Sequence, residues 1–147
     1  MYDGILNLHS YWAYAVLGLL LIAILNAFTG LSSKRVFTPK DRQISMIALI
    51  FTHVQFVIGL ILLFTSPIVK SGFAAGMGEV MKNAEVRKLA VEHPFINLLA
   101  IVLITIGWSK HKRIEESARK FKSIGVFYAI GMVLLLSRIP WDRWFEN

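Results

Sequence analysis

The sequence predicts an all-α integral membrane protein, a bundle of four helices in up-down-up-down order. Three observations predict this class: 56% of the 147 residues are hydrophobic, the mean hydropathy is +0.60, and the apolar residues form four long blocks. Only helices and closed barrels satisfy their backbone groups in lipid, and these blocks are too continuous for the alternating strands of a barrel. We therefore expect a single four-helix transmembrane domain over residues 1–147.

The second block shows most clearly that the predicted helices are long enough to span a membrane. It carries no Asp, Glu, Lys or Arg from Ile44 to Thr65, which as a helix covers about 33 Å and can cross a hydrocarbon core of about 30 Å. Pro39 precedes it and is expected to lie in a loop that no helix continues through, whereas Pro94 suits the first turn of the third helix. The predicted spans are residues 9–30, 43–66, 93–108 and 123–139.

The longest predicted connection, residues 67–92, carries a loose apolar stripe at helical spacing. We expect a short helix there, lying over the outer mouth of the bundle. The stripe consists of Met77, Val80, Met81, Ala84 and Leu89.

Basic residues predict the orientation of the chain. Ten of the sixteen Lys and Arg residues lie in two short connections, which is typical of cytoplasmic loops and favours a membrane topology over nucleic-acid binding. Both termini are then expected on the periplasmic side of a bacterial inner membrane. Residues 1–8 lack the basic start of a cleavable signal, so the first span is expected to be retained. The ten are Lys34, Arg35, Lys40, Arg42, Lys110, Lys112, Arg113, Arg119, Lys120 and Lys122.

Three histidines lie in or at the predicted spans and are the candidate cofactor ligands. His53 falls near the middle of the second span, where an ionisable side chain costs about 2.5 kcal/mol or more if charged and normally faces a partner inside the bundle. His9 and His93 open the first and third spans, about 16 Å and about 10 Å above mid-membrane. Parallel helices can stand diagonally across such a bundle, so these two could grip a haem iron from both faces.

His53 admits several roles. Helix tilt could bring it level with His93 as an axial pair, or it could bind a second cofactor with Met132. With Thr52 and Gln55 beside it, His53 could instead relay protons or contact a quinone. All three histidines could also be structural hydrogen-bond partners between helices, or together form a copper or zinc site.

Two further residues complete the candidate set. Arg138 lies near the outer end of the last span, where its guanidinium suits a haem propionate or could simply reach to the interface. His111 lies in a basic connection and is expected to be solvated. The chain has no cysteine, which excludes disulfides, iron–sulfur clusters, thiolate ligands and covalent haem attachment.

Four short motifs resemble a family of small four-span bacterial membrane proteins described as cytochrome b-like and typical of Bacteroidota. The motifs are LHSYWAY, FTHVQ, VEHPF and SRIPW, and the resemblance runs over nearly the whole chain. It implies a haem-bearing or electron-transfer membrane subunit. His9, His53 and His93 would then be candidate ligands, and Arg138 a motif residue.

The sequence therefore predicts a membrane cytochrome that binds haem b non-covalently near its outer half. We expect one-electron transfer with a membrane quinone or a partner redox protein, and no stand-alone enzyme, since no catalytic base or substrate pocket is recognisable. One alternative is a cofactor-free assembly or scaffolding subunit of a larger complex or homo-oligomer, with Gly59, Gly125 and Gly131 at packing faces. Another is a protein that handles haem or metal transiently.

Overall fold

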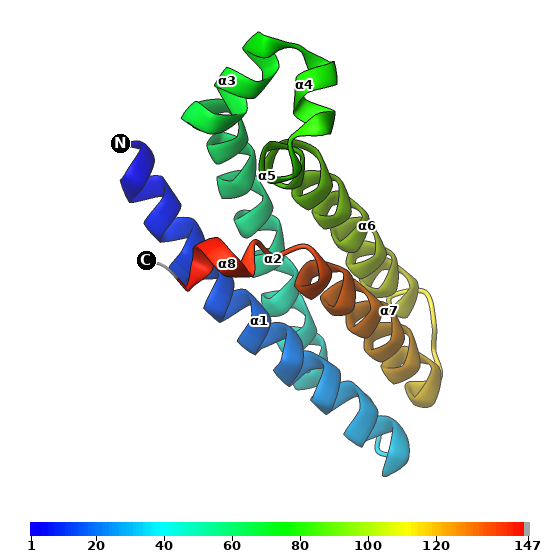
Figure 1. Ribbon diagram of the computed structural model, residues 1–147. Helices are drawn as coiled ribbons and strands as arrows, with labels where there is room; N and C mark the ends of the chain where they lie inside the picture. The colour runs from blue at the N-terminus through cyan, green and yellow to red at the C-terminus, as the bar shows by residue number, and fades with distance from the viewer. Residues whose placement is uncertain (146–147) are drawn as a thin grey trace.

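The computed structural model describes residues 1–145 and confirms an all-α four-helix bundle (Figure 1). Neighbouring helices pack in the order α1, α2, α6, α7 around the bundle, so α1 and α6 stand on one diagonal and α2 and α7 on the other. The first turn of α1 and the last described residues lie toward the same end of the bundle. The long helices are α1 (Tyr2–Ser32), α2 (Pro39–Thr65), α6 (His93–His111) and α7 (Ser117–Ser137).

The connection between α2 and α6 is more helical than expected. In place of one short helix it forms three, which turn back above the ends of α2 and α6, and a π-helical turn then leads into α6 (Figure 1). Of the predicted stripe, only Val80 is fully buried, in a small core with Val69 and Ala90. These elements are α3 (Pro67–Ala75), α4 (Met77–Lys82), α5 (Ala84–Arg87) and η1 (Lys88–Glu92); a last short helix, α8 (Trp141–Trp144), crosses over α1.

The prediction that Pro39 lies in a loop is wrong, because Pro39 is the first residue of α2. Thr38 caps the helix: its hydroxyl accepts from the backbone N–H of Asp41, and the Asp41 carboxylate accepts from the backbone N–H of Thr38. A proline in the first turn loses no hydrogen bond, since its N–H would be unpaired there in any case. Asp41, only 3% exposed, also accepts two bonds from Arg35 at 2.8 and 2.9 Å.

The third long helix begins at His93 with Pro94 in its first turn, as predicted. Helical structure also precedes it, so the segment that could cross a membrane runs without a break from Ala84 to His111. Pro94 cannot donate to the carbonyl four residues before it and its ring crowds that carbonyl. The wider π-helical turn at Lys88–Glu92 lies directly before this point, which is how a helix passes a proline without breaking.

The main core lies in the half of the bundle near the short connections Ser33–Thr38 and Lys112–Glu116, which we call the basic end. Here glycines allow helices to approach closely, because an added Cβ at Gly30 would lie 2.6 Å from the Phe121 ring and one at Gly131 would lie 2.6 Å from Ile104. The buried core residues are Val16, Leu20, Ala23, Ile24, Ala27, Ala48, Ile104, Trp108, Phe121, Ile124 and Tyr128.

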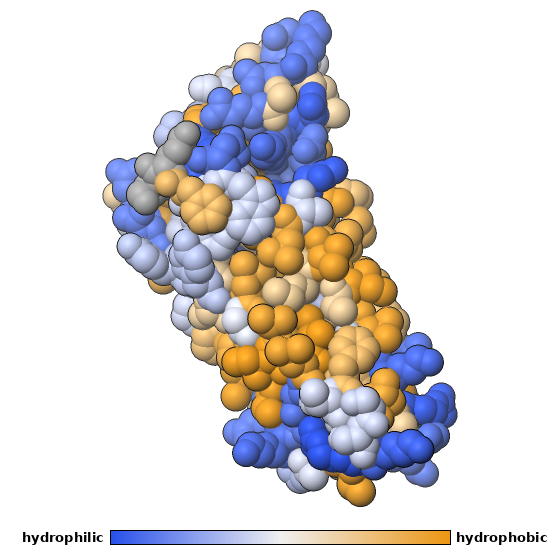
Figure 2. All heavy atoms as spheres, turned by 60° about the horizontal axis from the view of Figure 1, so that its bottom comes forward, coloured by the Kyte–Doolittle hydropathy of each residue, from blue (hydrophilic) through white to orange (hydrophobic). Residues whose placement is uncertain are grey.

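The surface separates a broad apolar band from two polar ends (Figure 2). The band faces outward over the middle of the bundle and includes exposed side chains such as Val57 and Val133. All four long helical segments are long and apolar enough to cross a membrane. The chain is therefore a multi-pass membrane protein in contact with lipid.

The close approach of α6 and α7 predicts that Gly107→Ala destabilises the bundle. A Cβ at Gly107 would lie 2.5 Å from Phe127 Cβ and 3.0 Å from the Ser123 carbonyl oxygen, neither of which is a flexible side-chain end. We expect a loss of about 1–3 kcal/mol in unfolding free energy, measured by denaturant titration in detergent. The control is Gly18→Ala, which meets no atom within 4 Å and should leave stability unchanged or higher. Equal effects of the two substitutions would contradict the packing argument.

Candidate functional site

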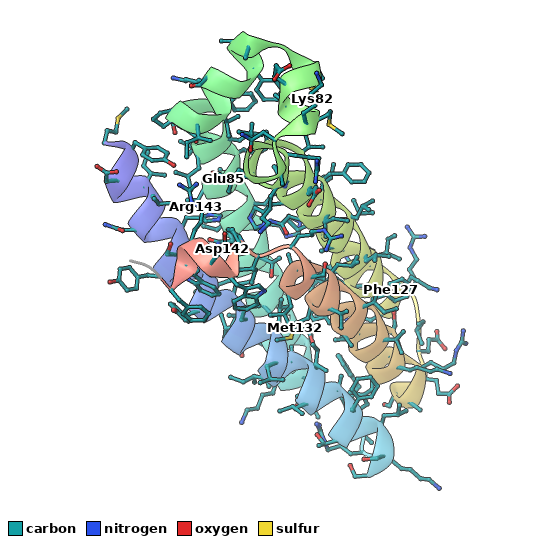
Figure 3. All side chains as sticks on the ribbon, viewed as in Figure 1. Lys82, Glu85, Phe127, Met132, Asp142 and Arg143 are labelled. Carbon is teal, nitrogen blue, oxygen red and sulfur yellow. The ribbon has the colours of Figure 1, made fainter. Side chains whose placement is uncertain are left out.

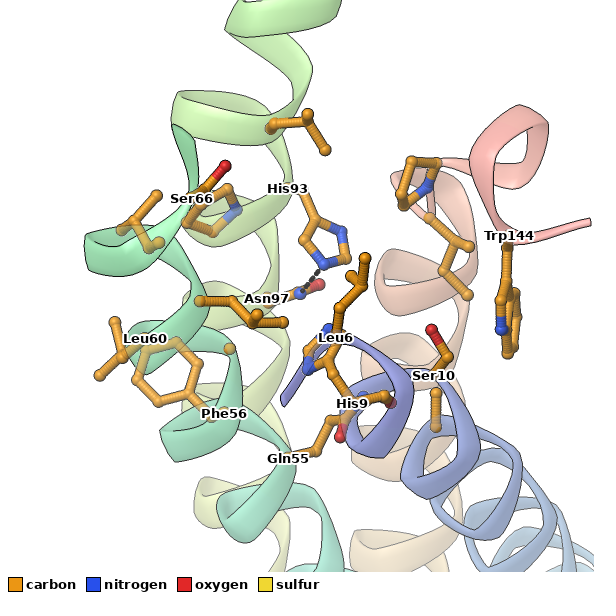
Figure 4. Close-up of a pocket in the computed structure, with 18 of the residues that line it drawn as sticks. Leu6, His9, Ser10, Gln55, Phe56, Leu60, Ser66, His93, Asn97 and Trp144 are labelled. Atoms are coloured by element: carbon orange, nitrogen blue, oxygen red, sulfur yellow. Dashed lines mark hydrogen bonds between the residues drawn. The ribbon is translucent and has the colours of Figure 1, made fainter. Parts of the chain in front are cut away.

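An apolar cavity of about 440 Å³ occupies the half of the bundle opposite the basic end. All four long helices line it, and α3 and α8 contribute at its outer side (Figure 4). Leu6, Phe56, Leu60 and Leu135 represent its mainly aliphatic and aromatic wall. The volume falls within the range of small-molecule sites, which are typically apolar with a few placed polar groups.

The structure brings His9 and His93 together in this cavity. His9 comes from α1 and His93 from α6, on the diagonal of the bundle, and their ring centroids are 6.3 Å apart with the planes at 79°. Two imidazole nitrogens on opposite sides of one metal ion at about 2.0 Å are about 4 Å apart, and their ring centroids about 6 Å apart. The separation therefore suits two-sided ligation of one ion.

Hydrogen bonds fix the tautomer of His93. Its Nδ1 lies 2.8 Å from the carbonyl oxygen of Arg138, and a carbonyl only accepts, so Nδ1 carries the proton and donates. Its Nε2 is then an unprotonated acceptor, 3.1 Å from the side-chain nitrogen of Asn97, which donates to it. An N–H anchored to a carbonyl oxygen, with the other nitrogen carrying a lone pair, is the usual arrangement of a metal-binding histidine.

His9 is held from the side of α2. Gln55 donates from Nε2 to the backbone carbonyl of His9 at 2.9 Å, which fixes this turn of α1 against α2. A Cβ at Gly59 would lie 3.2 Å from Cε1 of the His9 ring, closer than most such contacts. The glycine therefore leaves the room that the His9 ring occupies.

Three buried polar atoms have no hydrogen-bond partner within residues 1–145, and all three belong to residues that line this cavity. They are His9 Nδ1, Gln55 Oε1 and Asn97 Oδ1. A buried polar atom without a partner costs about 1–3 kcal/mol, so native proteins nearly always satisfy it with a neighbour, a water or a ligand. Their convergence indicates that a polar group belongs in this otherwise apolar space.

Two arginines at this end of the bundle contact the site, one through its backbone and one through its side chain. Arg138 reaches His93 through its backbone carbonyl, while its side chain lies 3.8 Å from a Glu92 oxygen in a long ion pair. Arg143, on α8, lines the cavity and lies 3.7 Å from Glu85 at the junction with α5 (Figure 3). Sequence reasoning did not single out Arg143, because its position depends on how α8 folds back across α1.

His53 does not line the cavity, and both of its nitrogens have hydrogen-bond partners. Nδ1 lies 2.8 Å from the carbonyl oxygen of Leu49, one turn earlier in α2, and Nε2 lies 3.3 Å from the hydroxyl of Thr105 on α6. The arrangement is that of a polar side chain tying two helices together. Met132, the partner considered for it, packs against the main core.

The expectation that His111 is solvated is wrong, because this residue is only 1% exposed. It is the last residue of α6, its Nδ1 bonds to the Trp108 carbonyl, and its ring contacts Phe37 and Trp108. The connection around it is short, so the ring folds inward over the end of the core while the neighbouring lysines stay in solvent. His111 lies at the basic end, away from the cavity.

Within residues 1–145, no three His, Cys, Asp or Glu side chains come close enough to share a metal ion. His9, His53 and His93 are therefore not gathered as a three-histidine copper or zinc site would require. Binding of a haem would require only two histidines near each other. This finding therefore does not test the haem hypothesis, which stays a prediction.

Comparisons of this chain with models of protein families, with curated proteins and with solved structures found no match. The resemblance to cytochrome b-like proteins thus stays a prediction, and only the site supports a function.

The site predicts that the ligand-free protein holds His93 as the Nδ1–H tautomer at neutral pH. Free neutral imidazole side chains exchange between tautomers, whereas here only Nδ1–H can bond to the Arg138 carbonyl. The ¹⁵N spectrum of histidine-labelled protein should show this tautomer, assigned by its absence in His93→Gln. Asn97→Leu is the matched control and should leave the tautomer unchanged. An Nε2–H signal for His93 would contradict the proposed geometry.

Proposed function

We propose that this protein is a membrane electron-transfer protein that holds one haem b between His9 and His93. The observation that carries the proposal is the meeting of these two rings, from diagonal helices, at 6.3 Å inside an apolar cavity. A haem bound there would supply a one-electron couple.

The lone pair of His93 Nε2 is the better prepared ligand. The bond from Nδ1–H to the Arg138 carbonyl orients the ring and raises its basicity, and Asn97 is the group that would give way at Nε2. On the other side, Gln55 is held beside His9, so its unpartnered Oε1 is available to a ring N–H of His9. Both rings would then be held by second hydrogen bonds.

The walls and charges of the cavity also suit this cofactor. Aliphatic and aromatic side chains such as Phe56 and Leu135 exclude water, and burial of this kind helps to set a reduction potential. Arg143 lines the cavity, and the ion pair of Arg138 with Glu92 is long at 3.8 Å. Either guanidinium is a suitable partner for a propionate carboxylate.

The electron partner would be a membrane quinone or a second redox protein. The apolar band on the face in Figure 2 supports the first, because a quinone reaches the protein through the same lipid. In this setting the protein carries electrons between partners and performs no bond-making reaction of its own.

The competing function is a cofactor-free subunit that supports a larger membrane complex. The surroundings of His53 and His111 support this function, because both side chains form hydrogen bonds or ring contacts within the bundle, as structural residues do. His9 differs from them, with a buried ring nitrogen that lacks any partner among residues 1–145. That difference favours the haem proposal over a cofactor-free subunit.

We further propose that the protein lies in a bacterial inner membrane with its basic end in the cytoplasm. Short loops beside membrane spans that are rich in Lys and Arg are retained on that side. The termini and α3–α5 would then lie in the periplasm, and so would the end of the bundle that holds the cavity.

The haem proposal predicts that the protein, purified in detergent after expression with haem available, shows a sharp reduced α-band and a shifted Soret band. His9→Ala and His93→Ala should each abolish this low-spin spectrum, because each removes one of the two axial nitrogens. His53→Ala is the matched control and should keep it.

Each variant is first checked for a helical circular dichroism spectrum and a single size-exclusion peak, so that unfolding is not read as loss of a ligand. A wild-type protein that stays colourless after haem addition would contradict the proposed electron-transfer function and favour the cofactor-free subunit. Loss of the band in His53→Ala alone would move the site away from His9 and His93.

The orientation is testable because the natural chain has no cysteine. We expect Ser71→Cys, in the exposed α3, to react with a membrane-impermeant maleimide in spheroplasts. Lys34→Cys, in the basic connection, should react only after the membrane is opened. The reverse labelling pattern would place the cavity in the cytoplasmic half.

A further inference from the structure

The whole net charge of the protein comes from its basic end. Residues 31–42 and 109–122 hold ten of the sixteen Lys and Arg residues but only three of the nine acidic residues. The rest of the chain has six basic and six acidic residues. The excess of seven basic residues in these two segments therefore equals the net charge of +7. An excess gathered in two connections that lie side by side at one end of the bundle produces a concentrated positive field.

Ion pairing differs sharply between the two ends. At the cavity end, five cations have acidic partners within 4 Å; the pairs are Lys82–Glu79, Arg87–Glu92, Lys88–Asp142, Arg138–Glu92 and Arg143–Glu85. Among residues 1–145, Arg35 is the one cation of the two basic segments that pairs with an acid, the buried Asp41. The other nine have no such partner within the described residues.

Three of these unpaired cations converge on a row of aromatic rings. The row consists of Trp108, His111 and Phe37, with His111 in the middle at 4.5 Å from Trp108 and 5.6 Å from Phe37 between ring centroids. Arg42 and Lys112 lie over the Trp108 ring at 5.6 and 5.9 Å, although one comes from the first turn of α2 and the other follows α6.

Lys120, from α7, completes the group. Its ammonium lies 5.3 Å from the centroid of Phe37. Arg42, Lys112 and Lys120 are all within electrostatic range of His111. A cation over a ring face is a favourable contact, and none of these three cations has an acidic partner within 4 Å among residues 1–145.

We propose that Arg42, Lys112 and Lys120 form a binding site for the phosphate of an anionic phospholipid. Arg42 lies in the first turn of α2 and Lys112 directly follows α6, so both stand at ends of segments that can cross a membrane, where lipid headgroups would lie, and both lie over the ring of the largely buried Trp108. A guanidinium and two ammonium groups give charge-assisted bonds to phosphate oxygens. Basic sites between helices at the cytoplasmic surface suit such headgroups. The proposal is independent of any cofactor in the cavity.

The experiment compares short-chain phosphatidylglycerol with phosphatidylcholine, titrated into the protein in a neutral maltoside detergent and counted by native mass spectrometry. Wild type should bind phosphatidylglycerol in preference. Arg42→Gln with Lys112→Gln should weaken that binding about tenfold or more, as expected for two interfacial cations. Arg119→Gln with Lys122→Gln is the matched control: it removes the same two charges from exposed positions of α7 and should keep the binding.

Every other outcome overturns the proposal. Equal binding of both lipids would show that headgroup charge is not recognised, and equal loss in both double variants would reduce the effect to overall charge. Binding of glycerol 3-phosphate as tight as that of the lipid would assign the site to a free phosphate. If the first double variant fails to fold, Arg42→Lys with Lys112→Arg keeps both charges and must retain the preference for phosphatidylglycerol.

Discussion

The bundle depends on the close approach of α1, α6 and α7 at the basic end. In lipid no hydrophobic effect drives helices together, so association relies on van der Waals contact, which requires small residues opposite large ones. Gly30 against Phe121 and Gly131 against Ile104 supply it. The cavity beside His9 and His93 lies in the opposite half of the bundle, where all four long helices line it.

Burying polar groups in the cavity costs free energy unless they form hydrogen bonds. Gln55 and Asn97 each use one side-chain atom to hold a histidine in place, through the His9 backbone and the His93 ring, and each leaves its amide oxygen unpartnered. An apolar residue at either position would avoid the cost in a cavity that stayed dry. Both amide oxygens are therefore open to a hydrogen bond from water or from a ligand.

The sequence predicted the fold because long uncharged segments in a bilayer have few alternatives, and the diagonal relation of α1 and α6 followed from short connections. It also singled out His9 and His93. It could not predict that Gly59 makes room for His9, since this depends on how α2 faces α1. The inward turn of His111 was missed for a similar reason: a charged connection looks solvated until the packing of its aromatic neighbours is known.

The two ends of the molecule differ in how their basic residues are neutralised. Outside the two basic segments, five of the six cations form ion pairs with acids of the chain, and basic and acidic residues are equal in number. At the basic end Asp41 is already committed to Arg35, and the remaining cations are left to the surroundings. A membrane surface with anionic lipid neutralises such an end and a neutral one does not. On the two proposals above, the same charge asymmetry would both orient the protein and favour an anionic lipid surface at its basic end.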